Sequence, residues 1–131
     1  MKKFPFIKQH DAMDCGPACI GIIAKFYGRR YSLEYLNERS FITRSGVSLL
    51  GISKAAESIG MRTVGLKIGY EKLKESKLPC IVHWNQNHFV VVYKIEKDKV
   101  YISDPAHGLL VYTKKEFLNS RVTVLCFFVL L

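Results

Sequence analysis

The segment Gln-His-Asp-Ala-Met-Asp-Cys-Gly-Pro-Ala-Cys at residues 9–19 decides the fold. Its Gly16-Pro17 pair marks a helix start, because a proline at an early helical position gives up an N–H that has no partner there. From Ala18 onward, apolar residues recur every three or four positions, which predicts a helix that Gly28 ends. Cys15 therefore lies at the N-terminus of this helix, where the helix dipole and free N–H groups favour the thiolate.

Length and composition point to one globular domain. The chain has 131 residues, enough for a single sizeable core, and its 49% hydrophobic and 24% charged content argues against a disordered tail protein. Twenty Lys and Arg against 11 Asp and Glu give a net charge of +9, which raises nucleic acid, an anionic membrane or an acidic partner as candidates. The basic residues are scattered and no aromatic platform alternates with them, so we expect no nucleic-acid partner.

The sequence shows neither a secretion signal nor a spanning helix. The two lysines at the start have no apolar run behind them. The longest apolar stretch, residues 122–131, has ten residues, against about 20 for a transmembrane helix, and its β-branched and aromatic content predicts a final strand. We therefore expect a chain that is soluble by itself, in a reducing cytosol. A hydrophobic terminus of this kind suggests one domain cut from a longer protein.

The helical pattern gives way to a strand pattern near residue 62. Before it, Ser32 is placed to cap a short helix through residue 38, and Ser48 to cap a helix over residues 49–59. After it, Thr113 to Glu116 forms a capping box for a last short helix. Helices followed by an antiparallel meander predict an α+β fold rather than a parallel sheet. The predicted strands cover residues 62–68, 79–84, 88–96, 99–103 and 122–131, with a short helix at 71–76.

Cys15 has candidate chemical partners in the strand half. A nucleophilic thiolate needs a general base in reach and a group that orients that base. His88 begins one predicted strand and Asp104 ends the next, across a turn near residues 96–99. Antiparallel pairing about that turn brings His88 and Asp104 close to opposite each other, so that Asp104 can hold the imidazole in one tautomer. Gly16 leaves space beside the sulfur for a substrate carbonyl.

Three motifs, in this order, resemble the C39 family of cysteine peptidases. They are QHDAMDCGPAC at 9–19, NHFVVVY at 87–93 and SDPAHG at 103–108, and the similarity also covers residues 45–63 and 78–89. C39 domains are papain-like and are fused to the N-terminus of bacterial ABC exporters. The resemblance implies a papain-like α+β fold, with an N-terminal helical half packed on a C-terminal antiparallel sheet. It also implies that residues 1–131 are a single peptidase domain in the N-terminal part of a longer transporter chain.

The activity implied by the resemblance is removal of leader peptides, typically ending in a double glycine, from bacteriocin-like or other exported precursors. Carried over residue by residue, Cys15 is the nucleophile of an acyl-thioester mechanism, His88 the base and Asp104 the orienting group. Gln9, six residues before the cysteine, matches the oxyanion-hole side chain, and a neutral amide donor suits developing negative charge. No metal or organic cofactor is implied. ATP would bind elsewhere in the parent chain, because this segment has no Walker motif.

The implied partners are a precursor peptide with its leader and the transmembrane and nucleotide-binding domains of the parent ABC transporter. The implied location is the cytoplasmic face of the bacterial inner membrane. One segment departs from the family: Ser120 to Thr123 stands where members often carry an aromatic-x-Gly segment, which leaves the packing of the last strand open. Two other classes also stay open, a leader-binding module with little or no cleavage and a papain-like transferase or amidase.

Other candidate residues have structural interpretations, which we favour. Cys19 lies one helical turn from Cys15, but zinc ligands usually come as tighter pairs with a second pair elsewhere. We therefore expect Cys19, Cys80 and Cys126 in the core. Asp14 is expected to support the helix start, because a like charge beside a thiolate opposes its activation. Asp11 and His83 are interpreted as structural, and His10 and His107, in polar loops, as solvated.

Overall fold

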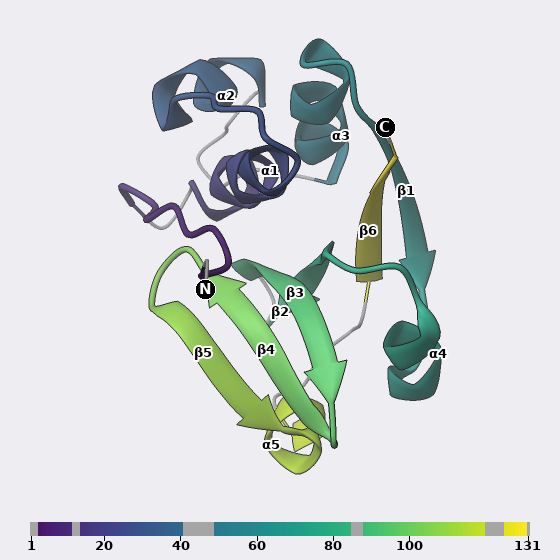
Figure 1. Cartoon of the computed structure of the whole chain (residues 1–131). Helices are drawn as coiled ribbons and strands as arrows, with labels where there is room; N and C mark the ends of the chain where they lie inside the picture. The colour runs from purple at the N-terminus through teal and green to yellow at the C-terminus, as the bar shows by residue number, and fades with distance from the viewer. Residues whose placement is uncertain (1–2, 12–13, 41–48, 85–87, 120–124, 131) are drawn as a thin grey trace.

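The structure, a computed structural model, describes residues 3–11, 14–40, 49–84, 88–119 and 125–130 (Figure 1). Its helices are α1 (Cys15–Phe26), α2 (Leu33–Arg39), α3 (Leu49–Ser58), α4 (Tyr70–Glu75) and α5 (Lys114–Asn119). Its strands are β1 (Arg62–Lys67), β2 (Cys80–Trp84), β3 (His88–Glu96), β4 (Lys99–Asp104), β5 (Gly108–Thr113) and β6 (Leu125–Leu130). A helical first half and a strand-rich second half confirm the predicted α+β class. Over the described ranges, no helix has the length and hydropathy needed to span a membrane.

The strands form one antiparallel sheet in the order β1-β6-β2-β3-β4-β5. Strands β2 to β5 neighbour each other in chain order, as the predicted meander requires. β6 departs from that prediction, because it lies between β1 and β2 and pairs with both. Such a position agrees with the continuous apolar sequence of β6, since a strand inside a sheet can be covered on both faces.

Hydrophobic cores cover both faces of the sheet. Successive side chains of a strand point to opposite faces. Ile81 and Val91 accordingly pack with α1, α2 and α3, whereas Val82 and Val90 pack with α4 and α5. Figure 1 shows α1, α2 and α3 gathered together beside the sheet, with α5 next to β4 and β5. Nearly every residue of α1 is buried, which agrees with its apolar sequence and makes it the central helix of the helical half.

Local capping signals form as predicted. The Ser32 hydroxyl oxygen accepts a hydrogen bond from the backbone N–H of Tyr35 at 3.1 Å, and α2 begins directly after Ser32. Thr113 and Glu116 form a reciprocal capping box, with N–H···O distances of 2.8 and 3.1 Å. The predicted Ser48 cap, the turn at 85–87 and the segment 120–123 lie outside the described residues.

Strand β5 was not among the predicted strands. No helix or strand was predicted between the strand at 99–103 and the capping box at 113–116, whereas Gly108 to Thr113 pairs with β4 along its whole length. The burial pattern of β5 alternates, but its exposed positions carry the apolar residues Leu109 and Val111. Apolar side chains on the solvent side hide the period of two that marks a half-buried strand.

A bulge interrupts the pairing of β3 with β4. The two strands are joined by Lys97 and Asp98, which have φ of 51° and 55°, as a two-residue hairpin of the I′ type requires. Tyr93 is the extra residue, and its ring stacks on Phe4 with centroids 4.0 Å apart. Between the turn and the bulge, the paired residues are Glu96↔Lys99, Ile95↔Val100 and Lys94↔Tyr101. On the far side of the bulge from the turn, they are Val92↔Ile102 and Val91↔Ser103.

Candidate active site

Cys15 is the first residue of α1 and lies where the helical half meets the sheet. Its side chain is buried, with 3% of the residue exposed. The helix begins with the backbone N–H of Ala18 donating to the carbonyl of Asp14 at 3.0 Å. The first N–H groups of a helix have no partner within it, so the sulfur lies at the positive end of the helix dipole.

Asp14 fixes the loop that leads to Cys15. Its carboxylate accepts hydrogen bonds from the backbone N–H groups of His10 at 3.0 Å and Asp11 at 3.3 Å. It also accepts one from the Asn37 amide of α2 at 3.2 Å. Asp14 is buried and makes no side-chain hydrogen bond to the helix N-terminus. These contacts agree with the structural interpretation and show how it is realised, through the loop and α2 rather than as a helix cap.

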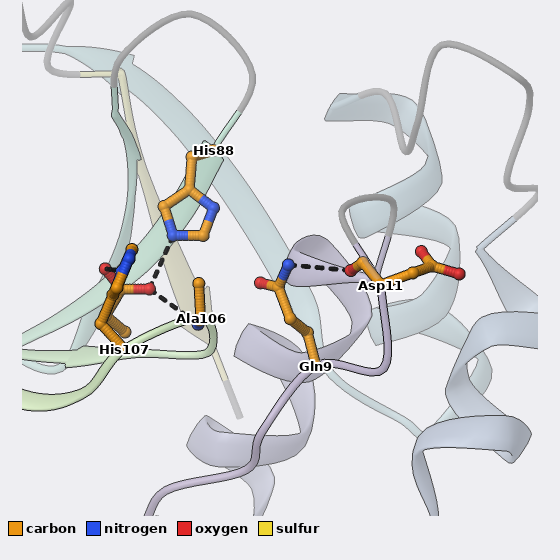
Figure 2. A network of polar contacts seen from close by, with 6 residues as sticks. Gln9, Asp11, His88, Ala106 and His107 are labelled. Carbon is orange, nitrogen blue, oxygen red and sulfur yellow. Dashed lines mark hydrogen bonds and ion pairs between the residues drawn. The ribbon is translucent and has the colours of Figure 1, made fainter.

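His88 joins β3 to β4 through Asp104. The Nε2 atom of His88 lies 2.6 Å from Oδ1 of Asp104 (Figure 2). Little of either side chain is exposed, 22% for His88 and 7% for Asp104. The side chain of Cys15 is a second hydrogen-bond partner of His88. Because Asp104 occupies Nε2, we infer that Nδ1 is the ring nitrogen that faces the sulfur.

The two contacts of His88 decide its charge. Burial disfavours the imidazolium, but the hydrogen bonds to Asp104 and Cys15 outweigh burial and raise the pKa of His88 from 6.5 to about 9. Burial likewise opposes ionisation of Asp104, but its hydrogen bonds to His88 and to the Ala106 N–H hold its pKa below the usual range. At neutral pH the pair is therefore an imidazolium bound to a carboxylate, with protons on both ring nitrogens.

Two further groups bind the Asp104 carboxylate. The backbone N–H of Ala106 donates to Oδ1 at 2.8 Å, and Nδ1 of His107 lies 3.1 Å from Oδ2. The interpretation of His107 as solvated agrees with its exposure, because 68% of its side chain is exposed, and the structure adds a contact between its ring and the carboxylate that holds His88. An Asp three residues before a His in a tight turn is the signal that could have shown this contact.

Gln9 lies beside this cluster. Its backbone N–H donates to the carbonyl of Pro105 at 2.9 Å, which ties the N-terminal segment to the turn after β4. Its side-chain nitrogen donates to the carbonyl of Asp11 at 2.8 Å, and Figure 2 shows the amide turned toward Asp11. The amide oxygen is buried and has no hydrogen-bond partner within the described part of the chain. A primary amide has two hydrogens, so this contact uses one of them.

Cys19 and Cys80 are fully buried, as expected for core residues. Burial, together with the charges of Cys15 and Asp104, raises the pKa of Cys19 and keeps it a neutral thiol. His83 packs its ring against Phe89, with centroids 4.8 Å apart. The side chain of Cys126 lies outside the described residues, and His10 is mostly exposed.

Comparison with known proteins places these residues in a family. The sequence profile of the peptidase C39 family matches residues 3–127, nearly the whole chain. The chain belongs to the peptidase C39 family. Membership confirms the cysteine-peptidase class that the three sequence motifs implied.

Curated relatives of this C39 chain are much longer proteins. The lactococcin-G-processing and transport ATP-binding protein LagD of Lactococcus lactis subsp. lactis is 39% identical over 133 residues, which cover 97% of this chain and 19% of that protein. The colicin V secretion/processing ATP-binding protein CvaB of Escherichia coli is 33% identical over 115 residues, covering 88% of this chain and 16% of that protein. The C39 chain therefore spans less than a fifth of the length of either relative.

A solved structure shares the architecture. The double glycine motif protease from an AMS/PCAT transporter, in complex with the leader peptide, superposes with a TM-score of 0.91 at 35% identity. The match covers 98% of this C39 chain and 91% of that chain. The likeness confirms the predicted papain-like fold, with an N-terminal helical half packed on an antiparallel sheet.

Proposed function

We propose that this C39 domain is an endopeptidase that removes double-glycine-type leaders from bacteriocin-like or other exported precursor peptides. One observation carries the proposal: His88 is hydrogen-bonded to both Cys15 and Asp104. Those contacts supply a nucleophile, a proton carrier and an orienting group, the set that acyl transfer needs. A relative with a bound leader peptide and relatives with processing functions support the choice of substrate.

In the proposed mechanism, the Cys15 thiolate attacks the scissile carbonyl. The amide of Gln9 and the backbone N–H of Cys15 donate to the oxyanion that forms. The His88 imidazolium gives its proton to the leaving amine, and a thioester to Cys15 remains. Neutral His88 then takes a proton from water, the hydroxide hydrolyses the thioester, and Asp104 holds the ring throughout. None of these steps uses a cofactor.

The same proposal extends to the parent protein. Residues 1–131 would be one peptidase domain of a longer ABC-transporter chain, with its transmembrane and nucleotide-binding domains as partners. Its place would be the cytoplasmic face of the bacterial cell membrane, where precursor peptides meet the exporter. Support comes from two relatives that are transport or secretion ATP-binding proteins several times longer than this chain. Nucleic acid has no role in the proposal.

The test is incubation of the domain with candidate precursor peptides, followed by intact mass measurement. We expect a cut directly after the double glycine, no cut by Cys15→Ala, and unchanged leader affinity for that variant. Cys19→Ala is the matched control, because Cys19 is a buried thiol one helical turn away, and it should keep most of the activity. Equal losses in the two variants would point to a paired-cysteine site. Binding without cleavage by the wild type would favour a recruitment module instead.

A further inference from the structure

A second chemical possibility lies at Asp104, where two imidazoles meet one carboxylate. Among the described residues, His88, Asp104 and His107 offer one ligand atom each, and these atoms lie within 4.8 Å of one another. The proposed peptidase mechanism uses His88 and Asp104, whereas His107 only contacts the Asp104 carboxylate and takes part in no chemical step. We propose that the three side chains bind a divalent transition-metal ion of the zinc class, and that the bound ion reversibly inhibits the peptidase.

The spacing of the ligand atoms suits a zinc ion after small movements. Zinc bonds to nitrogen and oxygen are about 2.0–2.2 Å long, so neighbouring ligand atoms of a tetrahedral site lie about 3.3 Å apart. The His107 Nδ1 to Asp104 Oδ2 distance of 3.1 Å is already close to that value. The His88 Nε2 to Asp104 Oδ1 distance of 2.6 Å has to open. His107 is the most exposed of the three, so its side chain is the one that can move inward.

The donor set selects the kind of ion. Two imidazole nitrogens with one carboxylate oxygen suit zinc and its neighbours, whereas magnesium and calcium prefer oxygen ligands throughout. The Ala106 N–H donates to the Oδ1 atom of Asp104 and fixes the direction of that atom. A fourth position can be filled by water from the exposed side of His107. The matching chemistry and an open approach distinguish this cluster from an ordinary surface histidine.

The bound ion would stop catalysis by occupying Nε2 of His88. It takes the place of the proton that this nitrogen shares with Asp104. A metal-bound imidazole then holds its remaining proton on Nδ1, because losing it would leave an imidazolate. His88 can no longer pass a proton between Cys15 and the leaving amine. This effect on turnover rests on the proposed function, whereas metal binding itself does not.

The first experiment measures binding without the thiol. Zinc is titrated into Cys15→Ala by calorimetry, with Cys15→Ser as a second background in case the first variant folds poorly. We expect one zinc ion per chain, and at least a tenfold weaker affinity once His107→Ala is added. His10→Ala is the matched control, because His10 is an exposed imidazole 4.0 Å from the Asp14 carboxylate and does not belong to the three-residue group at Asp104. Absence of binding, or equal affinity with and without His107, would overturn the metal site.

The second experiment measures inhibition with Cys15 intact. Zinc should inhibit precursor cleavage, a chelator should restore it, and magnesium should have no effect. The inhibition constant, referred to each variant's own uninhibited rate, should rise at least tenfold in His107→Ala and stay unchanged in His10→Ala. Equal inhibition of all three proteins would mean that zinc acts on the Cys15 thiolate, which would overturn the inhibitory role. If the wild type cleaves no precursor, the proposed function fails, and the calorimetric titration still decides the metal site.

Discussion

The Nε2 atom of His88 lies 2.6 Å from Oδ1 of Asp104, at the ends of two neighbouring strands. The carboxylate is buried and charged, and its second oxygen is bound to His107. A carboxylate fixed in this way holds the imidazole ring in place and stabilises its protonated form. The charge of His88 at working pH therefore depends on a contact that mutation can remove.

The decrease of kcat/KM at alkaline pH should follow the deprotonation of His88. Because the pKa of His88 is raised to about 9, kcat/KM for precursor cleavage should stay level through neutral pH and fall above about pH 9. The proton that protonates the leaving amine is lost in that range. The raised pKa also stabilises the fold, by a contribution that is complete below pH 6.5 and lost as the pH rises through about 9. A profile with stopped-flow or mass detection between pH 6 and about 10 checks the limb.

Asp104→Asn is the control for that assignment. Its neutral amide keeps the shape but removes the charge that favours the imidazolium, so the limb should move toward lower pH, with a lower kcat and little change in KM. A limb that stays near pH 9 in Asp104→Asn would assign the titration to another group.

Loss of the Gln9 amide should slow the chemical step. Gln9→Ala should lower kcat by about 100-fold or more, the usual effect of removing one oxyanion donor. Gln9→Glu should be at least as damaging, because an ionised carboxylate repels the forming oxyanion. Leader affinity, measured in the Cys15→Ala background, should not change. A decrease of less than about tenfold in kcat for Gln9→Ala would remove Gln9 from the oxyanion hole.

Asp14 should matter for stability. Asp14→Ala leaves the N–H groups of His10 and Asp11 without their acceptor and frees Asn37 from the loop. We expect a decrease of about 1–3 kcal/mol in the free energy of unfolding, measured in urea. Asn37→Ala removes one of these hydrogen bonds and should cost less, about 1 kcal/mol. Equal values for the two variants would show that the backbone contacts contribute little.

Substrate glycines test the specificity separately from the chemistry. A cleft that accepts two glycines before the scissile bond should be too narrow for side chains there. Replacing either glycine of a precursor with alanine should therefore block cleavage, as judged by intact mass, while leader binding remains. Cleavage of the replaced precursors at an unchanged rate would refute the double-glycine assignment, even with Cys15 acting as the nucleophile.

The parts of the fold that depend on local signals were predicted well. Ser32 caps α2, and Thr113 with Glu116 caps α5, because each motif acts within one helical turn. The position of β6 was not predictable in this way. Its pairing with β1 joins residues more than 55 positions apart, and no local pattern specifies which strands an apolar segment will pair with.

The residues of the candidate site could likewise be predicted only in part from the sequence. Strand order alone suggested that His88 lies near Asp104, and the structure brings Cys15 to the same imidazole. Gln9 was assigned only through the family resemblance, and its role stays a prediction. His107 was missed because a histidine in a polar loop is usually solvated, and the Asp three residues before it in the same turn was not used as a signal for a contact.

The bulge at Tyr93 decides whether the side chains of His88 and Asp104 lie on the same face of the sheet. Counting back from Glu96↔Lys99 without it would set Asp104 opposite Val91, an odd number of residues from His88 and so on the other face. Beyond the bulge the ladder ends at Val91↔Ser103, and extending that register by one residue sets Val90 opposite Asp104, on the same face as His88. The single extra residue Tyr93 therefore sets the pairing register of β3 with β4 at this end of the hairpin. Inserting or deleting two residues between His88 and the turn would keep the His88 side chain on the same face of the sheet. Inserting or deleting one residue would turn the imidazole away from the Asp104 carboxylate.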